Sequence, residues 1–185
     1  SRKGLNMSDE FKITLAQLNA TVGDLSGNNQ KVMEAWEIAR DERSDLIAFP
    51  EMFITGYNPQ DLILKNAFQK AATSSIEQIA AACSQGPAIA IGGPFCDGDK
   101  LYNSYYILAG GKIQAVIKKH HLPNEEVFDE VRLFSSGNVD GPFQIGKMRI
   151  GSPICEDAWH TDIVETLAET GAQTLLVPNG SPYYR

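Results

Sequence analysis

The stretch Met148-Arg-Ile-Gly-Ser-Pro-Ile-Cys-Glu-Asp-Ala-Trp-His160 combines an apolar run with a cysteine and two carboxylates. Residues 161–170 follow it with the pattern of a helix that Gly171 closes. A strand, then Cys155, then the start of a helix is an arrangement that holds a nucleophile on a tight turn. Helix N-termini and a neighbouring cation favour the reactive thiolate. Composition alone favours a buried, unreactive thiol. Whether Cys155 is a nucleophile therefore depends on the residues found elsewhere in the chain.

Composition excludes several classes of function. The 185 residues suit one substantial domain, with 43% hydrophobic and 21% charged residues. The net charge is -7, and no basic cluster exceeds Lys118-Lys119, which argues against nucleic-acid binding. No apolar run approaches the ~20 residues of a membrane span. The three cysteines, at wide spacing, form neither a disulfide framework nor a metal motif, so we expect a cytoplasmic protein.

The two ends of the chain carry separate expectations. Residues 1–6 are polar and read as a short leader before a native start at Met7, without the features of a signal peptide. Residues 7–185 are expected to form one domain, without an internal boundary. The chain ends at Arg185 directly after a predicted strand and without a closing helix, so we expect this domain to be incomplete.

Apolar residues alternate between strand and helix patterns along the chain. One helix is predicted to begin with Asn28 or Asn29 as N-cap, with Val32, Ala35, Trp36 and Ala39 facing the core. A second covers residues 74–82, with Cys83 in the core. Strands are predicted at residues 11–18, 45–50, 88–92, 101–108, 113–117, 143–146, 148–150 and 174–177. Helices covering sheets indicate a layered α/β or α+β sandwich.

Three predicted strands end in side chains that a hydrophobic pattern does not require. Glu51, Lys119 and Cys155 each follow an apolar segment. A carboxylate can take the thiol proton and return it to a leaving amine, while an ammonium stabilises the thiolate and an oxyanion. Taken singly, each residue also fits a structural role, as a turn residue, a solvated strand end or a core thiol. Spacing alone therefore leaves the triad open.

Motifs around these three residues resemble a known family. They are Phe49-Pro-Glu51 with Thr55-Gly-Tyr57, Lys119-His-His-Leu-Pro123, and Ile154-Cys-Glu-Asp-Ala-Trp159. Their order and spacing are similar to those of the carbon–nitrogen hydrolase (nitrilase-like) superfamily, over residues 11–184. The resemblance implies a four-layer α-β-β-α sandwich and a Glu-Lys-Cys triad. Leu101-Tyr-Asn-Ser104 and Phe128-Asp-Glu-Val-Arg132 resemble, more narrowly, the N-terminal glutaminase domains of glutamine-dependent NAD+ synthetases.

The resemblance also implies roles for individual residues. Glu51 would be the general base, Lys119 the cation at the oxyanion, and Cys155 the nucleophile. Glu130 matches a second glutamate that supports the lysine. Two further positions, Glu156 and Ser181, match places that recognise the amino-acid end of the substrate.

The implied activity is hydrolysis of the side-chain amide of L-glutamine through a cysteine thioester. The ammonia would supply ATP-dependent NAD+ synthesis from the nicotinate dinucleotide by a synthetase domain of the same full-length protein. We expect no metal or cofactor in this domain, ATP and Mg in the synthetase domain, and a homo-oligomer. No pyrophosphate-binding loop occurs before Arg185, and Glu125-Glu126 replaces a Tyr-Gly pair of many relatives, so part of the glutamine pocket is expected to differ.

Four alternatives stay open. A stand-alone amidase or carbamoylase would keep the triad with another pocket. A papain-like enzyme would pair Cys155 with His121 or His160, although adjacent His120-His121 more often gives one buried and one exposed ring. A zinc site would use Cys155, Asp157 and His160, without a clear fourth ligand. A non-catalytic binding module would keep the triad idle.

Overall fold

A computed structural model describes residues 10–123 and 130–180 of the chain. Its larger sheet has the order β1-β2-β3-β4-β5. The strands are β1 (Ile13–Leu15), β2 (Leu46–Ala48), β3 (Ala88–Asp97), β4 (Lys100–Ala109) and β5 (Lys112–Lys118). β1, β2 and β3 are parallel, whereas β3, β4 and β5 are antiparallel. β4 and β5 form a hairpin whose turn contains Gly110 and Gly111, with φ of 62° and 84°, which glycine adopts without strain.

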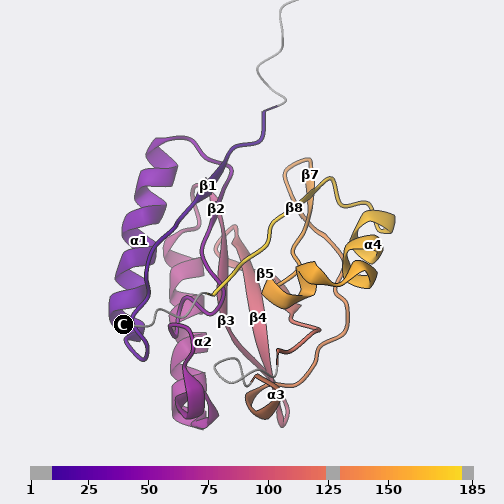
Figure 1. The fold of residues 1–185 in the computed structure, drawn as a ribbon. Coiled ribbons are helices and arrows are strands. Elements are labelled where there is room, and N and C mark those ends of the chain that lie inside the picture. Colours follow the sequence, from indigo (N-terminus) through magenta and orange to yellow (C-terminus); the bar gives the residue numbers. More distant parts are fainter. Residues whose placement is uncertain (1–9, 124–129, 181–185) are drawn as a thin grey trace, which may run out of the picture.

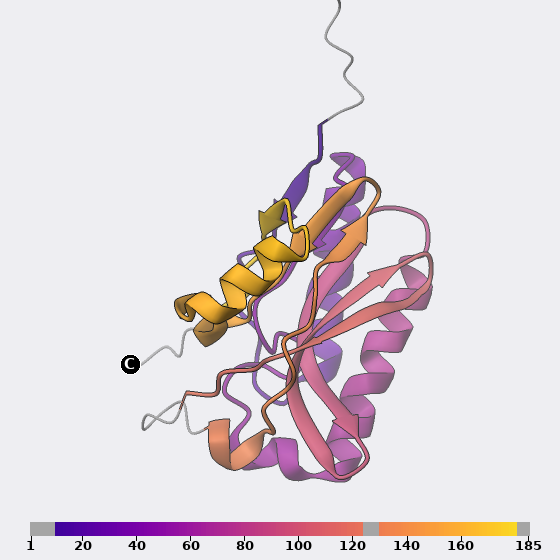
Figure 2. The ribbon, with the colours of Figure 1, turned by 90° about the vertical axis from the view of Figure 1, so that its right-hand side faces the viewer.

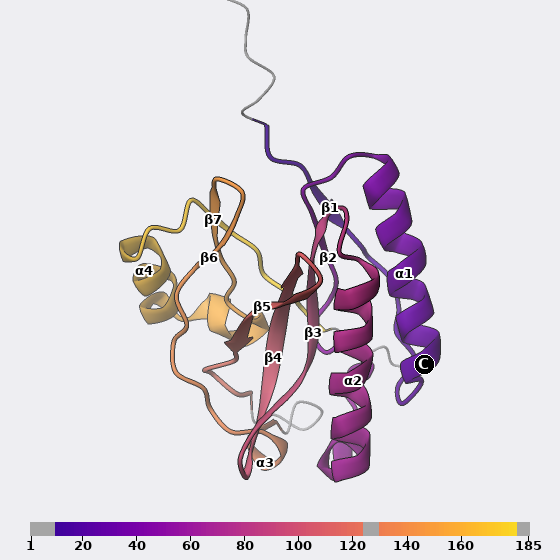
Figure 3. The same ribbon diagram turned by 180° about the vertical axis from the view of Figure 1, so that it is seen from behind.

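Two helices cover one face of this sheet, α1 (Leu25–Asp41) and α2 (Asn66–Ala82), as Figures 1 and 3 show. The predicted stripe of α1 is confirmed, because Val32, Trp36 and Ala39 are buried against the sheet. The Trp36 indole N–H donates to the Pro87 carbonyl oxygen at 3.0 Å. Cys83 lies in the same cluster, as predicted.

The smaller sheet consists of β6 (Phe143–Ile145), β7 (Met148–Gly151) and β8 (Thr174–Leu175). A second core cluster joins the inner faces of the two sheets, with Tyr105 and Ile107 on one side and Phe143 and Ile150 on the other. Helix α4 (Thr161–Glu169) lies on the far side from α1 and α2 (Figures 1 and 2). The order of layers is therefore α-β-β-α, which confirms the predicted architecture.

Two short helices complete the framework near the candidate site. α3 (Glu130–Leu133) has Glu130 as a fully buried first residue. A 3-10 helix, Cys155–Trp159, follows β7 and precedes α4. A further 3-10 helix, Gln60–Leu64, leads into α2. None of the described helices is both long and apolar enough to cross a bilayer.

The predicted start of α1 is wrong. Asp24 is the N-cap, and its carboxylate accepts from the Gly27 N–H at 2.9 Å. Asn28 is instead fully buried inside the helix. Its side chain bonds the Thr21 N–H and carbonyl and the Ile54 carbonyl, at 2.8, 2.9 and 3.1 Å. This amide is used to hold two loops together, so it cannot cap the helix.

Other predicted boundaries are shifted. α2 begins at Asn66, earlier than the predicted residue 74, because exposed polar residues obscure the apolar period in its first half. β1 and β8 are shorter than predicted, since each keeps only a few ladder pairs. Hydrogen bonding to neighbouring strands sets where these strands end. The local sequence pattern carries no information about that pairing.

Candidate active site

Glu51 lies on a turn directly after β2, pressed against β3. A Cβ on Gly92 would lie 2.0 Å from the Met52 nitrogen, so only glycine permits this close approach. The Ile54 N–H donates to the Gly92 carbonyl at 3.1 Å and fixes the turn to the strand. The Glu51 side chain is consequently buried, with 1% of the residue exposed.

Lys119 follows the last residue of β5 and points into the protein. Its backbone N–H donates to the Asn103 carbonyl at 2.8 Å, and its carbonyl accepts from the Gly137 N–H at 2.9 Å. The side chain is fully buried. The preceding Lys118 lies instead over the rings of Phe95 and Tyr102, at 5.5 Å from each centroid. The structure thus places the two lysines in different surroundings, and only Lys119 reaches the buried carboxylates.

A buried ionic cluster forms around the Lys119 ammonium. Lys119 Nζ lies 2.7 Å from Glu51 Oε1 and 3.1 Å from the Glu130 carboxylate. The Asn103 amide donates to Glu51 Oε1 at 2.8 Å and to Glu130 Oε2 at 3.4 Å. The Tyr57 hydroxyl donates to Glu130 Oε1 at 2.8 Å. Each carboxylate therefore has one cationic and at least one neutral donor.

The electrostatics of this cluster keep the lysine charged. Burial alone would lower the pKa of Lys119, but Glu51 and Glu130 outweigh it and raise this pKa above its ordinary value. Burial raises the pKa of Glu130, which Lys119 opposes and Glu51 reinforces. Burial and the negative charges of Glu130 and Glu51 also raise the pKa of the Tyr57 hydroxyl, so it remains a donor.

Cys155 begins the 3-10 helix after β7 in a strained backbone conformation, with φ of 46°. This left-handed region is uncommon for a residue with a side chain and recurs at functional sites. The Cys155 N–H donates to the Pro178 carbonyl at 2.9 Å, which fixes the turn to the segment after β8. The residue is half-buried. The predicted tight turn at this position is confirmed.

The thiol of Cys155 interacts electrostatically with the ionic cluster. Burial and then the Glu51 carboxylate raise its pKa to about 11, against the lowering effects of Lys119 and the Gly180 N–H. The thiol is therefore protonated at neutral pH. Because the charge of Glu51 acts directly on this thiol, a base that can take its proton is already close by.

From the sequence, Asp157 was considered only as a zinc ligand, and the structure gives it a different role. It is 3% exposed. Its carboxylate accepts from the backbone N–H groups of His121 at 2.6 Å, His120 at 3.1 Å and Ile154 at 3.4 Å. Asp157 thereby ties the turn that carries Cys155 to the segment that follows Lys119.

The predicted site residues are only partly brought together. Glu51, Lys119 and Glu130 are in direct contact, and Cys155 adjoins them. Glu156 lies apart from this cluster, with its carboxylate 3.3 Å from His160 Nε2. Ser181 and the Glu125-Glu126 pair lie outside the described residues.

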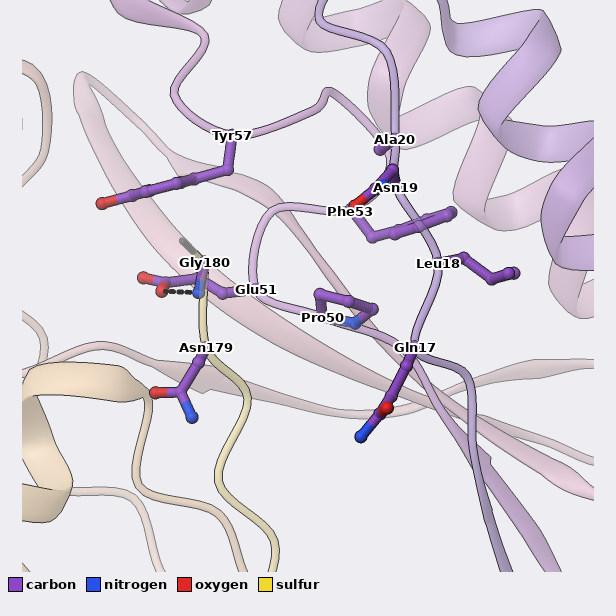
Figure 4. A pocket seen from close by; sticks show the side chains of 10 residues that line it. All are labelled: Gln17, Leu18, Asn19, Ala20, Pro50, Glu51, Phe53, Tyr57, Asn179 and Gly180. Carbon is purple, nitrogen blue, oxygen red and sulfur yellow. Dashed lines mark hydrogen bonds between the residues drawn. The ribbon is translucent and has the colours of Figure 1, made fainter. Parts of the chain in front are cut away.

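Sequence reasoning missed the roles of two residues in the cluster, Asn103 and Tyr57. Both stand in motifs that were quoted for the resemblance, and that was the available signal. It also missed the Gly180 N–H, which donates to Glu51 Oε2 at 3.0 Å. Figure 4 shows this bond.

The histidine alternatives do not fit this geometry. His160 stacks on His121, with ring centroids 3.5 Å apart, and its Nε2 contacts Glu156. Neither ring is among the groups that shift the pKa of the Cys155 thiol. The expectation of one buried and one exposed ring is wrong, because His120 and His121 are both half-buried. Among the described residues, the proposed zinc set Cys155, Asp157 and His160 does not form a ligand cluster.

A pocket of about 430 Å³ opens on the Glu51 side of the cluster (Figure 4). Its lining mixes polar and apolar side chains from three chain segments that lie far apart in the sequence. The lining residues are Gln17, Leu18, Asn19, Ala20, Pro50, Glu51, Phe53, Tyr57, Asn179 and Gly180. A small polar molecule can thus reach the carboxylate from this side.

The sheets, the turn carrying the cysteine and the buried carboxylate–lysine cluster define a hydrolase-type site. The carbon–nitrogen hydrolase family model matches residues 12–185, and the chain belongs to this family. It is 51% identical over 179 residues to the glutamine-dependent NAD(+) synthetase of Rhodobacter capsulatus, covering 97% of this chain and 32% of that protein. The corresponding enzyme of Aquifex aeolicus is 38% identical, covering 94% and 31%. The chain therefore spans about a third of the length of these relatives.

Solved structures agree with this assignment. Glutamine-dependent NAD+ synthetase from Acinetobacter baumannii, in complex with ADP, superposes with a TM-score of 0.88 at 34% identity, covering 94% of this chain and 33% of that one. The NitN amidase from Nesterenkonia has a TM-score of 0.80 at 24% identity, covering 92% and 67%. Because the amidase is only 24% identical, its similarity supports a shared fold and nothing more. The nitrilase-like architecture is thus confirmed.

Proposed function

We propose that residues 7–185 belong to the glutaminase part of a glutamine-dependent NAD+ synthetase. The observation that carries this proposal is the buried contact of Lys119 with Glu51 beside the protonated Cys155 thiol. The similarity to NAD(+) synthetases along nearly the whole chain supports L-glutamine as the substrate. We assign the roles of base, oxyanion cation and nucleophile to Glu51, Lys119 and Cys155 in that order.

The first half-reaction forms a thioester. Cys155 Sγ attacks the side-chain amide carbon of glutamine while Glu51 takes the thiol proton. The amide oxygen becomes an oxyanion that the Lys119 ammonium stabilises. When the C–N bond breaks, Glu51 returns the proton to the leaving nitrogen, and ammonia departs. Because the resting pKa of the thiol is about 11, this proton transfer to Glu51 is required at neutral pH.

The second half-reaction releases glutamate. Water attacks the γ-glutamyl thioester as Glu51 removes one of its protons. The C–S bond then breaks, and the thiolate regains a proton from Glu51, which restores the starting state. Loss of one oxyanion donor typically costs roughly 3–4 kcal/mol of transition-state stabilisation, so Lys119 is assigned a large share of the rate.

Glu130, Asn103 and Tyr57 support this machinery by holding Lys119 and Glu51 in place. Asn103 bonds both carboxylates, and Tyr57 bonds Glu130. Glu130 is thus assigned a positioning role. We retain Glu156 and Ser181 as proposed contacts to the amino-acid end of the substrate.

The proposal extends to the protein that contains this chain. Ammonia would pass to a synthetase domain that holds ATP and Mg, whereas this domain would need no cofactor. The protein would act in the cytoplasm as a homo-oligomer, without a nucleic-acid or membrane partner. The names of the similar proteins support the pairing with a synthetase domain.

The test is ammonia and glutamate release by the complete gene product. L-glutamine, L-asparagine and a carbamoyl amino acid are supplied separately, to the wild type and to Cys155→Ser. Release from glutamine alone, lost in the variant, supports the proposal. Release from the other amides with glutamine untouched would instead identify a stand-alone amidase or carbamoylase. Absence of release from all three would favour the non-catalytic binding module.

A further inference from the structure

All three histidines of the chain gather on the side of the molecule where α4 begins. The ring centroids of His120 and His121 lie 4.6 Å apart, and His160 stacks on His121. Asp162, in the first turn of α4, brings its Oδ1 to 3.4 Å from His121 Nε2. None of these four side chains has a part in the proposed hydrolysis.

We propose that His120, His121 and Asp162 form a site for a divalent transition-metal ion of the Zn²⁺ class. One ligand atom from each of the three residues lies within 4.8 Å of the other two. Tetrahedral Zn²⁺ with bonds of about 2.0–2.1 Å places neighbouring ligand atoms roughly 3.3 Å apart. The His121–Asp162 separation already matches this value, and the exposed Asp162 side chain can rotate to complete the set.

The ring of His120 is oriented as metal-binding imidazoles are. Its Nδ1 lies 2.5 Å from the Gly137 carbonyl oxygen, so Nδ1 carries the proton and donates it. The Nε2 lone pair is then available to a metal ion. A backbone carbonyl behind the ring is the usual partner that fixes the tautomer and orientation of a ligating histidine.

His121 supplies the second observation. Its Nε2 is shielded from solvent and has no hydrogen-bond partner of normal geometry among the described residues, although Asp162 lies near. A shielded, unsatisfied ring nitrogen is costly unless an ion or water completes it. The backbone N–H groups of both His120 and His121 are held by the buried Asp157 carboxylate, so the two rings are presented on a fixed segment.

The ligand set also indicates which ions fit. Two imidazoles and one carboxylate suit Zn²⁺ and its transition-metal neighbours, whereas Mg²⁺ and Ca²⁺ prefer oxygen ligands. Three protein ligands leave a fourth position for water. A bound ion would connect the segment after Lys119 with α4, in addition to the link that Asp157 already makes.

Calorimetric titration of the metal-free complete gene product with Zn²⁺ tests the site. Asp162→Asn and His120→Gln should each remove one ion per chain or weaken its binding at least about tenfold, since even changes behind a ligand cost this much. Glu165→Gln alters another exposed carboxylate of α4 and is the matched control, with unchanged binding expected. Asp162 is exposed, so this variant should keep its fold.

Cobalt substitution identifies the ligands independently of activity. The three-residue set predicts the visible bands of tetrahedral Co²⁺, without a thiolate charge-transfer band, and their loss in Asp162→Asn. Unchanged binding in both ligand variants would overturn the proposal, as would equal loss in Glu165→Gln. The proposal would also be overturned if Asp162→Asn kept a thiolate charge-transfer band and the wild type showed no other cobalt band. A cysteine would then hold the ion.

Discussion

Replacing Lys119 with methionine should strongly destabilise the fold. Methionine fills much of the lysine volume, so the principal change is loss of the ammonium 2.7 Å from Glu51 and 3.1 Å from Glu130. Asn103 and Tyr57 remain as neutral donors to the carboxylates. All three charged side chains are fully buried, and removing one partner of a buried pair costs about 3–5 kcal/mol.

This loss is large against the total stability of a domain, which is about 5–15 kcal/mol. For a chain of this size it corresponds to a fall in the thermal midpoint of about 6–20 °C. Urea unfolding followed by circular dichroism measures the change in free energy. Lys118→Met is the matched control; its ammonium only overlies two rings, so its cost should stay within about 1 kcal/mol.

A second variant tests the electrostatic cause. Adding Glu130→Gln to Lys119→Met removes one of the two carboxylates left without a cation, and should recover at least about 1 kcal/mol. The raised pKa of Glu130 also means that the wild type gains stability from this group as pH falls from the raised folded value towards 4.5. Glu130→Gln should remove that gain. A loss below about 1 kcal/mol for Lys119→Met, or simple additivity in the double variant, would refute the reasoning.

Three further predictions concern the thiol of Cys155, the loop contacts of Asn28 and the close approach at Gly92. Alkylation of Cys155 by iodoacetamide, followed by peptide mapping, should rise with an inflection near pH 11, because the folded thiol keeps its proton until then; an inflection near pH 8 would contradict this. Asn28→Ala should destabilise the chain by at least about 1–3 kcal/mol, since buried backbone groups lose their partner, and by clearly more than the control Asn29→Ala in urea unfolding. Gly92→Ala should reduce glutamine turnover at least tenfold by displacing the Glu51 turn. Unchanged turnover in a folded Gly92→Ala variant would show that the turn adapts.

The layered fold was largely predictable because its strands and helices carry clear hydrophobic periods. Val32, Trp36 and Ala39 repeat at helical spacing, and all three are buried. Asn28 shows where the prediction failed. An asparagine before a helical pattern is a good cap on local grounds, but its amide is bonded to Thr21 in the preceding loop and to Ile54, which is 26 residues away.

The site was predictable to a different degree from residue to residue. Resemblance gave Glu51, Lys119, Cys155 and Glu130, and the structure places them together or adjoining. Spacing alone could not do this, because the contact between Glu51 and Lys119 joins residues far apart in sequence. The role of Asp157 could not be predicted for a different reason. Its partners are backbone N–H groups, and these leave no trace in the identity of the partner side chains.

The central claim is that Cys155 forms a γ-glutamyl thioester, and rapid acid quenching during glutamine turnover tests it most directly. Mass spectrometry of the quenched protein should find an adduct equal to glutamine less ammonia, mapped to the peptide that contains Cys155. The adduct should be absent in Cys155→Ser and should not form in Lys119→Met. An adduct on any other residue, or steady glutamate release by Cys155→Ser, would contradict the account.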